Sequence, residues 1–137
     1  MPRSVEVVAS VAIGGAAGSV ARYLLSGAIQ ERNATVFPVG TLLVNVSGCL
    51  AIGFLMRLVL DTGEFSPPVR ALLTTGFLGG FTTFSTFAWE TMGSVEEGAF
   101  RRALAYVGGS VVFGLAAVWV GSAAAQLLLH AIRGEVT

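Results

Sequence analysis

Residues Gly76–Phe87 read GFLGGFTTFSTF and lie inside one of the longer apolar regions of the chain. Glycine costs about 1 kcal/mol relative to alanine inside a helix. The adjacent pair Gly79-Gly80, followed by Thr82 and Thr83, therefore predicts a broken helix. Irregular backbone at membrane depth is tolerated only where it is buried in protein or lines a wet cavity. Broken helices also expose carbonyl oxygens, which are natural ligands for an ion.

Hydroxyl groups and aromatic rings follow the predicted break. If the helix resumes at Thr82, then Thr82, Ser85 and Thr86 share one face, and Phe84 and Phe87 lie on a neighbouring face. A phenyl ring has an electropositive edge and an electronegative face. The two rings either solvate a small ion or pack against lipid and neighbouring helices, and the stretch alone leaves both interpretations open.

Four apolar stretches have the length needed to cross a membrane as helices, about 20 residues each. Only 12% of the residues are charged, about half the share of a soluble domain. The stretches are too long for barrel strands of about ten residues. The sequence therefore predicts an all-α, multi-pass integral membrane protein, with residues 1–137 as one four-helix domain and the third helix broken near Gly79-Gly80. The expected spans are Val7–Ala28, Val39–Leu60, Val69–Met92 and Ala103–Leu129.

Catalytic motifs do not occur in the sequence. The single histidine, His130, and the single cysteine, Cys49, belong to no metal-ligand cluster, and there is no Walker-type phosphate loop. We expect no enzymatic activity, no organic cofactor and no nucleic-acid partner. We expect the chain to be embedded in the lipid bilayer.

The basic residues are all arginines, and four spans divide them almost evenly between the two membrane sides. Orientation follows the Lys/Arg bias of short loops, and four against three is almost no bias. Either one strong loop fixes a single orientation, or both orientations insert and an antiparallel homodimer becomes possible. One side holds Arg3, Arg57, Arg70 and Arg133, and the other holds Arg32, Arg101 and Arg102.

The first span contains GGAAGSVARY, in which Gly14 and Gly18 share a helix face. Small residues at this spacing let helices approach closely in lipid. Arg22 lies on the same stripe. It either extends to the interface or finds a polar partner, because an unpartnered arginine is costly in the membrane.

The second span reads GTLLVNVSG and places Thr41, Asn45 and Gly48 on one stripe. The Asn45 carboxamide either bonds a neighbouring helix or turns its N–H groups toward a polar ligand.

The fourth span places Tyr106, Ser110 and Gly114 on one narrow track. A hydroxyl in a membrane helix most often bonds its own preceding turn, so this track alone is a weak sign of a ligand.

The motifs GGAAGSVARY, GTLLVNVSG and GFLGGFTTFSTF, in this order across four short spans, resemble those of the Fluc (CrcB-type) fluoride channels. The resemblance covers nearly the whole chain, and the second and third motifs together are specific. It implies a passive fluoride-selective channel of the cell (inner or plasma) membrane that gives fluoride resistance. It also implies a dual-topology antiparallel homodimer with two pores and a central structural sodium ion.

The resemblance also assigns roles to individual residues. The backbone carbonyls of Gly79 and Thr82 are expected to hold the sodium ion. Arg22 matches the arginine of the first-span motif and is a candidate for a structural or vestibule role. Gly114 replaces a hydroxyl that the family often has in the fourth-helix track. The expected fluoride pathway is formed by Asn45, Phe84, Phe87, Ser85, Thr86, Tyr106 and Ser110.

The chemistry of these residues suits fluoride. The ion loses its water at high cost, and hydroxyl and amide N–H groups can replace that water. Neutral donors also let the ion leave, which conduction requires. The Glu90 carboxylate opposes an anion, so it either lies at a vestibule mouth or is protonated.

Two other functions fit a short four-helix chain. A dual-topology multidrug/proton antiporter would need a membrane-embedded carboxylate in the first span, whose only acid, Glu6, lies near its start. A non-transporting membrane assembly subunit would use the glycines for packing alone.

Overall fold

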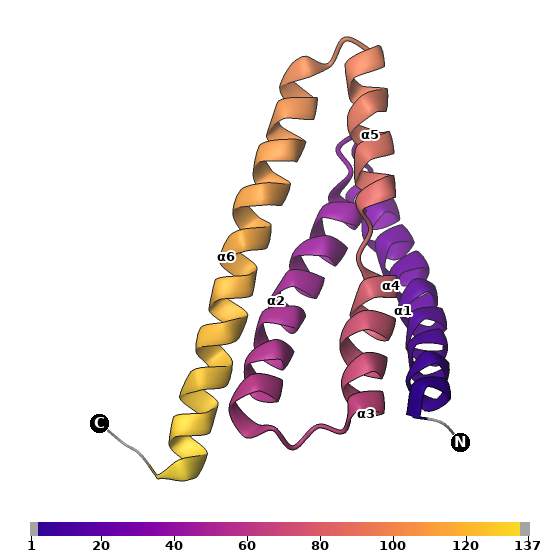
Figure 1. Ribbon diagram of the computed structural model, residues 1–137. Coiled ribbons are helices and arrows are strands. Elements are labelled where there is room, and N and C mark those ends of the chain that lie inside the picture. Colours follow the sequence, from indigo (N-terminus) through magenta and orange to yellow (C-terminus); the bar gives the residue numbers. More distant parts are fainter. Residues whose placement is uncertain (1–2, 135–137) are drawn as a thin grey trace.

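The computed structural model describes residues 3–134, and every regular element in that range is a helix. Helices α1, α2 and α6 are each long and apolar enough to cross a membrane. The other four elements follow one another and make the remaining crossing in pieces (Figure 1). The prediction of an all-α, multi-pass membrane protein is therefore confirmed, and four helical passes fit the structure. The elements are α1 (Arg3–Asn33), α2 (Val39–Thr62), α3 (Pro67–Ala71), the π-helix η1 (Leu72–Leu78), α4 (Gly79–Phe81), α5 (Phe84–Glu96) and α6 (Phe100–Arg133).

The connections alternate between the two ends of the molecule. The α2–α3 connection lies at the same end as the first turn of α1 and the last turn of α6, and the other two connections lie at the opposite end (Figure 1). At the first of these ends, Gly63 (φ 65°) stops α2, and its N–H donates to the carbonyl of Val59. Pro67 then starts α3, where its missing N–H costs nothing.

Glycines let α1 cross the third span at short range. A β-carbon added at Gly14 would lie 2.8 Å from the amide nitrogen of Phe77, and one added at Gly18 would overlap the Phe77 carbonyl. From the other side, a β-carbon at Gly80 would lie 2.5 Å from the carbonyl oxygen of Gly15. The predicted packing role of Gly14 and Gly18 is therefore confirmed, and glycines of the third span complete the contact.

Helices α2 and α6 approach each other in the same way. A β-carbon at Gly53 would overlap the carbonyl of Val118, and one at Gly121 would overlap the carbonyl of Leu50. Since each helix contributes a glycine at a point of contact, the backbones meet where lipid-like side chains alone would hold them apart.

The third span breaks at Thr82 and Thr83, beyond the glycine pair. Both threonines have extended backbone (φ −87°, ψ 156° and φ −147°, ψ 120°). Gly79 and Gly80 remain helical in α4, and helix resumes at Phe84. The predicted break near Gly79-Gly80, with helix from Thr82, is therefore displaced along the chain. Gly80 serves the contact with α1 and does not need to open the helix.

Large apolar side chains cover most of the outside of the bundle. Phe84, Trp89 and Trp119 are 79%, 80% and 73% exposed. Such side chains contact lipid or another protein when the helices cross a bilayer, because water would not support so much apolar surface.

Candidate functional site

The break in the third span is held by a side chain from α2. The Asn45 amide nitrogen donates to the carbonyl of Thr83 (3.0 Å), and the Thr83 N–H donates to Asn45 Oδ1 (2.8 Å). One carboxamide thus satisfies both backbone groups of a residue that has left the helix. Gly48 makes room for this contact, since a β-carbon there would overlap the Thr82 methyl group. The hydrogen bond between helices, one of the two interpretations of Asn45, is observed.

The break leaves carbonyl oxygens without their helical donors, among them those of Gly79 and Thr82. In a continuous helix the Thr83 N–H would bond the Gly79 carbonyl, but it donates to Asn45. The Thr86 N–H would bond the Thr82 carbonyl, but it donates to the Thr83 hydroxyl (3.2 Å). The carbonyls of Gly79 and Thr82 can therefore accept from, or coordinate, another group.

One carbonyl that lies between them, that of Gly80, accepts from an arginine of α1. Arg22 Nε donates to the Gly80 carbonyl oxygen (3.1 Å), and the Arg22 side chain is half-buried. The polar partner that Arg22 requires is thus backbone of the third span. This bond ties α1 to the last turn before the break.

Hydroxyl groups gather at the start of α5, around Thr83. Thr83 Oγ1 lies 3.0 Å from Thr86 Oγ1 and 3.3 Å from Ser85 Oγ, and it caps the helix through the Thr86 N–H. The predicted shared face of Thr82, Ser85 and Thr86 is wrong. The Thr82 hydroxyl donates back to the carbonyl of Leu78 (3.0 Å), because Thr82 lies in the break and not in α5.

One groove beside the break, here named the phenylalanine groove, has a volume of about 460 Å³. The Phe84 and Phe87 rings lie 5.7 Å apart in it at an angle of 46°. The Ser110 hydroxyl oxygen is buried at this groove, and within the described residues it has no hydrogen-bond partner. The polar and aromatic residues that line this groove are Asn45, Cys49, Thr74, Thr82, Thr83, Phe84, Phe87 and Ser110.

A second groove, here named the polar groove, lies on the other side of the break and has a volume of about 650 Å³. Thr83 is common to the linings of the two grooves. The break is therefore the point where they adjoin. The polar residues that line the polar groove include Arg22, Gln30, Thr41, Thr83, Thr86, Glu90, Ser94, Glu97 and Arg102.

The Glu90 carboxylate accepts hydrogen bonds from hydroxyl groups on two other helices. Thr41 donates to one carboxylate oxygen (2.8 Å) and Tyr106 donates to the other (2.6 Å). Tyr106 is fully buried, and its ring contacts the Phe87 ring at 5.1 Å and the Phe37 ring, edge to face, at 5.6 Å. The carboxylate thus links α2, α5 and α6 beside the polar groove.

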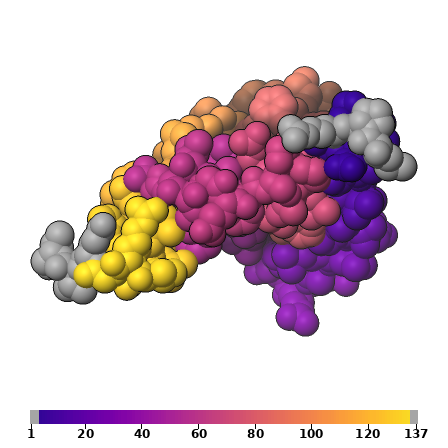
Figure 2. Space-filling model, turned by 60° about the horizontal axis from the view of Figure 1, so that its bottom comes forward, coloured from indigo at the N-terminus to yellow at the C-terminus, as the bar shows by residue number. Residues whose placement is uncertain are grey.

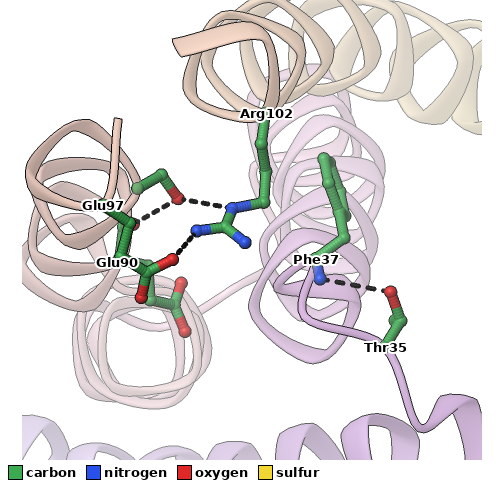
Figure 3. A network of polar contacts seen from close by, with 6 residues as sticks. Thr35, Phe37, Glu90, Glu97 and Arg102 are labelled. Carbon is green, nitrogen blue, oxygen red and sulfur yellow. Dashed lines mark hydrogen bonds and ion pairs between the residues drawn. The ribbon is translucent and has the colours of Figure 1, made fainter. Parts of the chain in front are cut away.

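An arginine of the polar groove makes several of its polar contacts with α5 (Figure 3). Arg102, on α6, donates from Nε to Ser94 Oγ (3.0 Å) and forms an ion pair with Glu97. Ser94 in turn donates to the Glu90 carbonyl (3.0 Å). Figure 3 also shows the Phe37 N–H bonded to the Thr35 hydroxyl in the connection before α2 (3.2 Å).

The structure separates the seven residues expected along the pathway. Four of them, Asn45, Phe84, Phe87 and Ser110, line the phenylalanine groove, and Thr86 lines the polar groove. Ser85 is exposed and Tyr106 is buried, so neither appears in the two linings.

Two residues at the site have contacts that the sequence did not indicate. Thr83 is the N-cap of α5, and a threonine directly before a helix start is the signal that could have identified it. Thr41 lies on the predicted stripe with Asn45, but its hydrogen-bond partner Glu90 is 49 residues away in the sequence. No spacing along the chain indicates that pairing.

Residues 9–122 match the family described as CrcB-like protein, Camphor Resistance (CrcB). The chain belongs to the CrcB family. Among CrcB-family relatives, it is 53% identical over 116 residues to the fluoride-specific ion channel FluC of Solibacter usitatus, which is 85% of this chain and 95% of that protein. It is 46% identical over 115 residues to the protein of the same name from Aquifex aeolicus, which is 84% and 93% of the two chains.

Proposed function

We propose that this CrcB-family protein is a fluoride-selective channel that lets fluoride leave the cell passively through the cell (inner or plasma) membrane. The relatives named fluoride-specific ion channels cover most of the chain. The observation that carries the proposal is the meeting of the two grooves at Thr83, where neutral hydrogen-bond donors surround a broken membrane helix.

Fluoride enters through the polar groove. The guanidinium groups of Arg22 and Arg102 line this groove and attract an anion. Both guanidinium groups already donate to protein oxygens. They therefore bind fluoride less tightly than two unpartnered cations would. The hydroxyls of Thr83 and Thr86, at the inner end, replace water as the ion loses its shell.

The ion then passes along the phenylalanine groove. The Asn45 carboxamide uses one N–H for Thr83, and its second N–H remains available to the ion. The Ser110 hydroxyl is buried there without a partner among the described residues. The edges of Phe84 and Phe87 supply weak positive potential without a fixed charge. Together these groups bind fluoride and still release it.

Glu90 does not oppose this pathway with an open carboxylate. Both of its oxygens accept hydroxyl hydrogens, from Thr41 and Tyr106. The carboxylate orients these two helices around the polar groove, and we assign it a vestibule position. The remaining pathway residues, Ser85 and Tyr106, act through the groups they bond or pack against, Thr83 and Phe87.

The active unit is an antiparallel homodimer with two pores. The Phe84 ring is 79% exposed on the rim of the phenylalanine groove, so a second chain that covers this face would enclose the ion. The near-equal division of arginines between the two sides lets opposed protomers insert. Residues 1–137 form one domain of each protomer.

A sodium ion fits the carbonyls of Gly79 and Thr82. Neither carbonyl has its helical donor, and both residues line the phenylalanine groove. Sodium binds hard oxygen ligands such as carbonyls. In a dimer of opposed chains, the break of each chain would supply two carbonyl oxygens. When bound, the ion would supply structural charge that holds the broken spans together. No organic cofactor, enzymatic activity or nucleic-acid partner is needed for this function.

An efflux measurement on purified protein in liposomes tests the proposal. We expect rapid loss of internal fluoride and strong discrimination against chloride. Comparable chloride and fluoride flux contradicts the proposal. Proton-coupled cation exchange would favour the antiporter, and no transport at all would favour an assembly subunit.

A further inference from the structure

A third groove lies away from the break, between the last turns of α2 and α6. Its volume is about 300 Å³, and its lining is mostly polar. Figure 2 looks onto this end of the molecule, where the final turns of α6 lie beside the end of α2. The groove, here named the terminal groove, is lined by Arg57, Asp61, Gln126, Leu129, His130 and Arg133.

Two arginines from different helices converge in the terminal groove on one aspartate. Arg57 Nε forms an ion pair with the Asp61 carboxylate (2.7 Å). An Arg133 terminal nitrogen donates to the Asp61 backbone carbonyl (3.0 Å). Each guanidinium has further N–H groups beyond the one used here. Arg133 bonds the backbone carbonyl and not the carboxylate, so two permanent positive charges lie beside the single negative charge of Asp61.

The position of the cluster indicates where a matching anion comes from. α2 ends at Thr62 and α6 ends at Arg133, so Arg57 and Arg133 lie within the last two turns of helices that cross the bilayer. We expect the headgroup phosphates of the lipids near this level, because about 20 helical residues cross the hydrocarbon core. Arginine suits phosphate oxygens because its planar fork can donate two parallel bonds. Basic pockets between membrane helices are typical sites for anionic headgroups.

We propose that the terminal groove binds the phosphate of an anionic lipid headgroup, with Arg57 and Arg133 as the main ligands and Gln126 as an additional donor. His130 lies in the wall of the groove. Asp61 holds the two arginines in place and also competes with the lipid for them. The site is independent of fluoride conduction, because it shares no residue with the two grooves at the break.

The test is a titration of the full-length protein in detergent micelles with phosphatidylglycerol, followed by native mass spectrometry of the bound lipid. Each arginine near a membrane surface contributes about a fivefold factor in affinity for an anionic lipid. Arg57→Gln with Arg133→Gln should therefore weaken binding by about 25-fold. Arg101→Gln, which removes an exposed arginine at the opposite end of α6, should leave the affinity unchanged.

Asp61→Asn provides a readout that a purely structural role would not produce. It removes the competing charge and keeps the shape of the side chain, so phosphatidylglycerol should bind more tightly, by about fivefold. This variant also keeps the test decisive if the double arginine variant does not fold.

Two further probes separate the possible sources of the phosphate. Phosphatidylcholine carries the same phosphate beside its own choline cation, so it should bind the wild type more weakly than phosphatidylglycerol does. Inorganic phosphate at millimolar concentration should not displace phosphatidylglycerol. Displacement by inorganic phosphate would overturn the lipid assignment, and equal phosphatidylglycerol affinity in wild type, Asp61→Asn and the double variant would overturn the site itself.

Discussion

Replacing Asn45 with alanine removes both hydrogen bonds that hold Thr83 in the break, at 3.0 and 2.8 Å. A buried polar group left without its partner costs about 1–3 kcal/mol. Two such groups, the N–H and the carbonyl of Thr83, give a range of about 2–6 kcal/mol. Thr83 lines both grooves, so water can reach it in part. We therefore expect a loss of about 2–3 kcal/mol in the free energy of unfolding.

Reversible unfolding in mixed detergent micelles measures this change. The matched control is Asn33→Ala. Asn33 also donates its amide to a backbone carbonyl, that of Ile29 (2.7 Å), but it does so at the exposed end of α1. The control should change stability by no more than about 0.5 kcal/mol. If the Asn45 and Asn33 variants lose the same small amount, Asn45 does not hold the break, and our account of the freed carbonyls fails with it.

Three other variants test the remaining contacts. Gly18→Ala should destabilise the fold by about 1–3 kcal/mol, because the added β-carbon would overlap the Phe77 carbonyl. The control Gly27→Ala, whose β-carbon would meet nothing within 4 Å, should be neutral or stabilising. Equal effects of the two variants in a thermal unfolding assay would refute the close crossing. Tyr106→Phe removes a donor to the Glu90 carboxylate and should lower the free energy of unfolding by about 1.5–3 kcal/mol in the same assay. An unchanged midpoint of thermal unfolding would show that this hydrogen bond does not stabilise the fold. Several lysines added to the α1–α2 connection should force one orientation and reduce fluoride flux, and full activity of a chain inserted wholly one way would exclude the antiparallel dimer.

The helices could be predicted because their signals are local. Long apolar runs define α1, α2 and α6, and the spacing of Gly14 and Gly18 predicts a close crossing. The position of the break could not be predicted in the same way. The glycine pair is the stronger local signal, but Gly80 is used to approach α1. The helix opens where Asn45, distant in sequence, can bond the backbone of Thr83.

The sequence indicated which residues lie near the break better than it indicated how they are arranged. Asn45, Phe84 and Phe87 do share a groove, as the motifs suggest. Ser85 is on the outside because the helix resumes at Phe84 and turns it away from both grooves. Glu90 was difficult to interpret from sequence because its two hydroxyl donors come from other helices.

The central claim is that fluoride crosses the membrane beside Phe84 and Phe87. Replacing both with isoleucine roughly keeps their apolar bulk, which should cost less than about 1.5 kcal/mol of stability at each position if they only pack, but it removes the polarised ring edges. Fluoride efflux from liposomes should be compared for the wild type and the Phe84→Ile/Phe87→Ile variant, each purified as a folded oligomer. Our account predicts that the variant loses nearly all fluoride flux while it elutes and unfolds like the wild type. Wild-type flux through the double variant would show that the rings only pack and that fluoride takes another route.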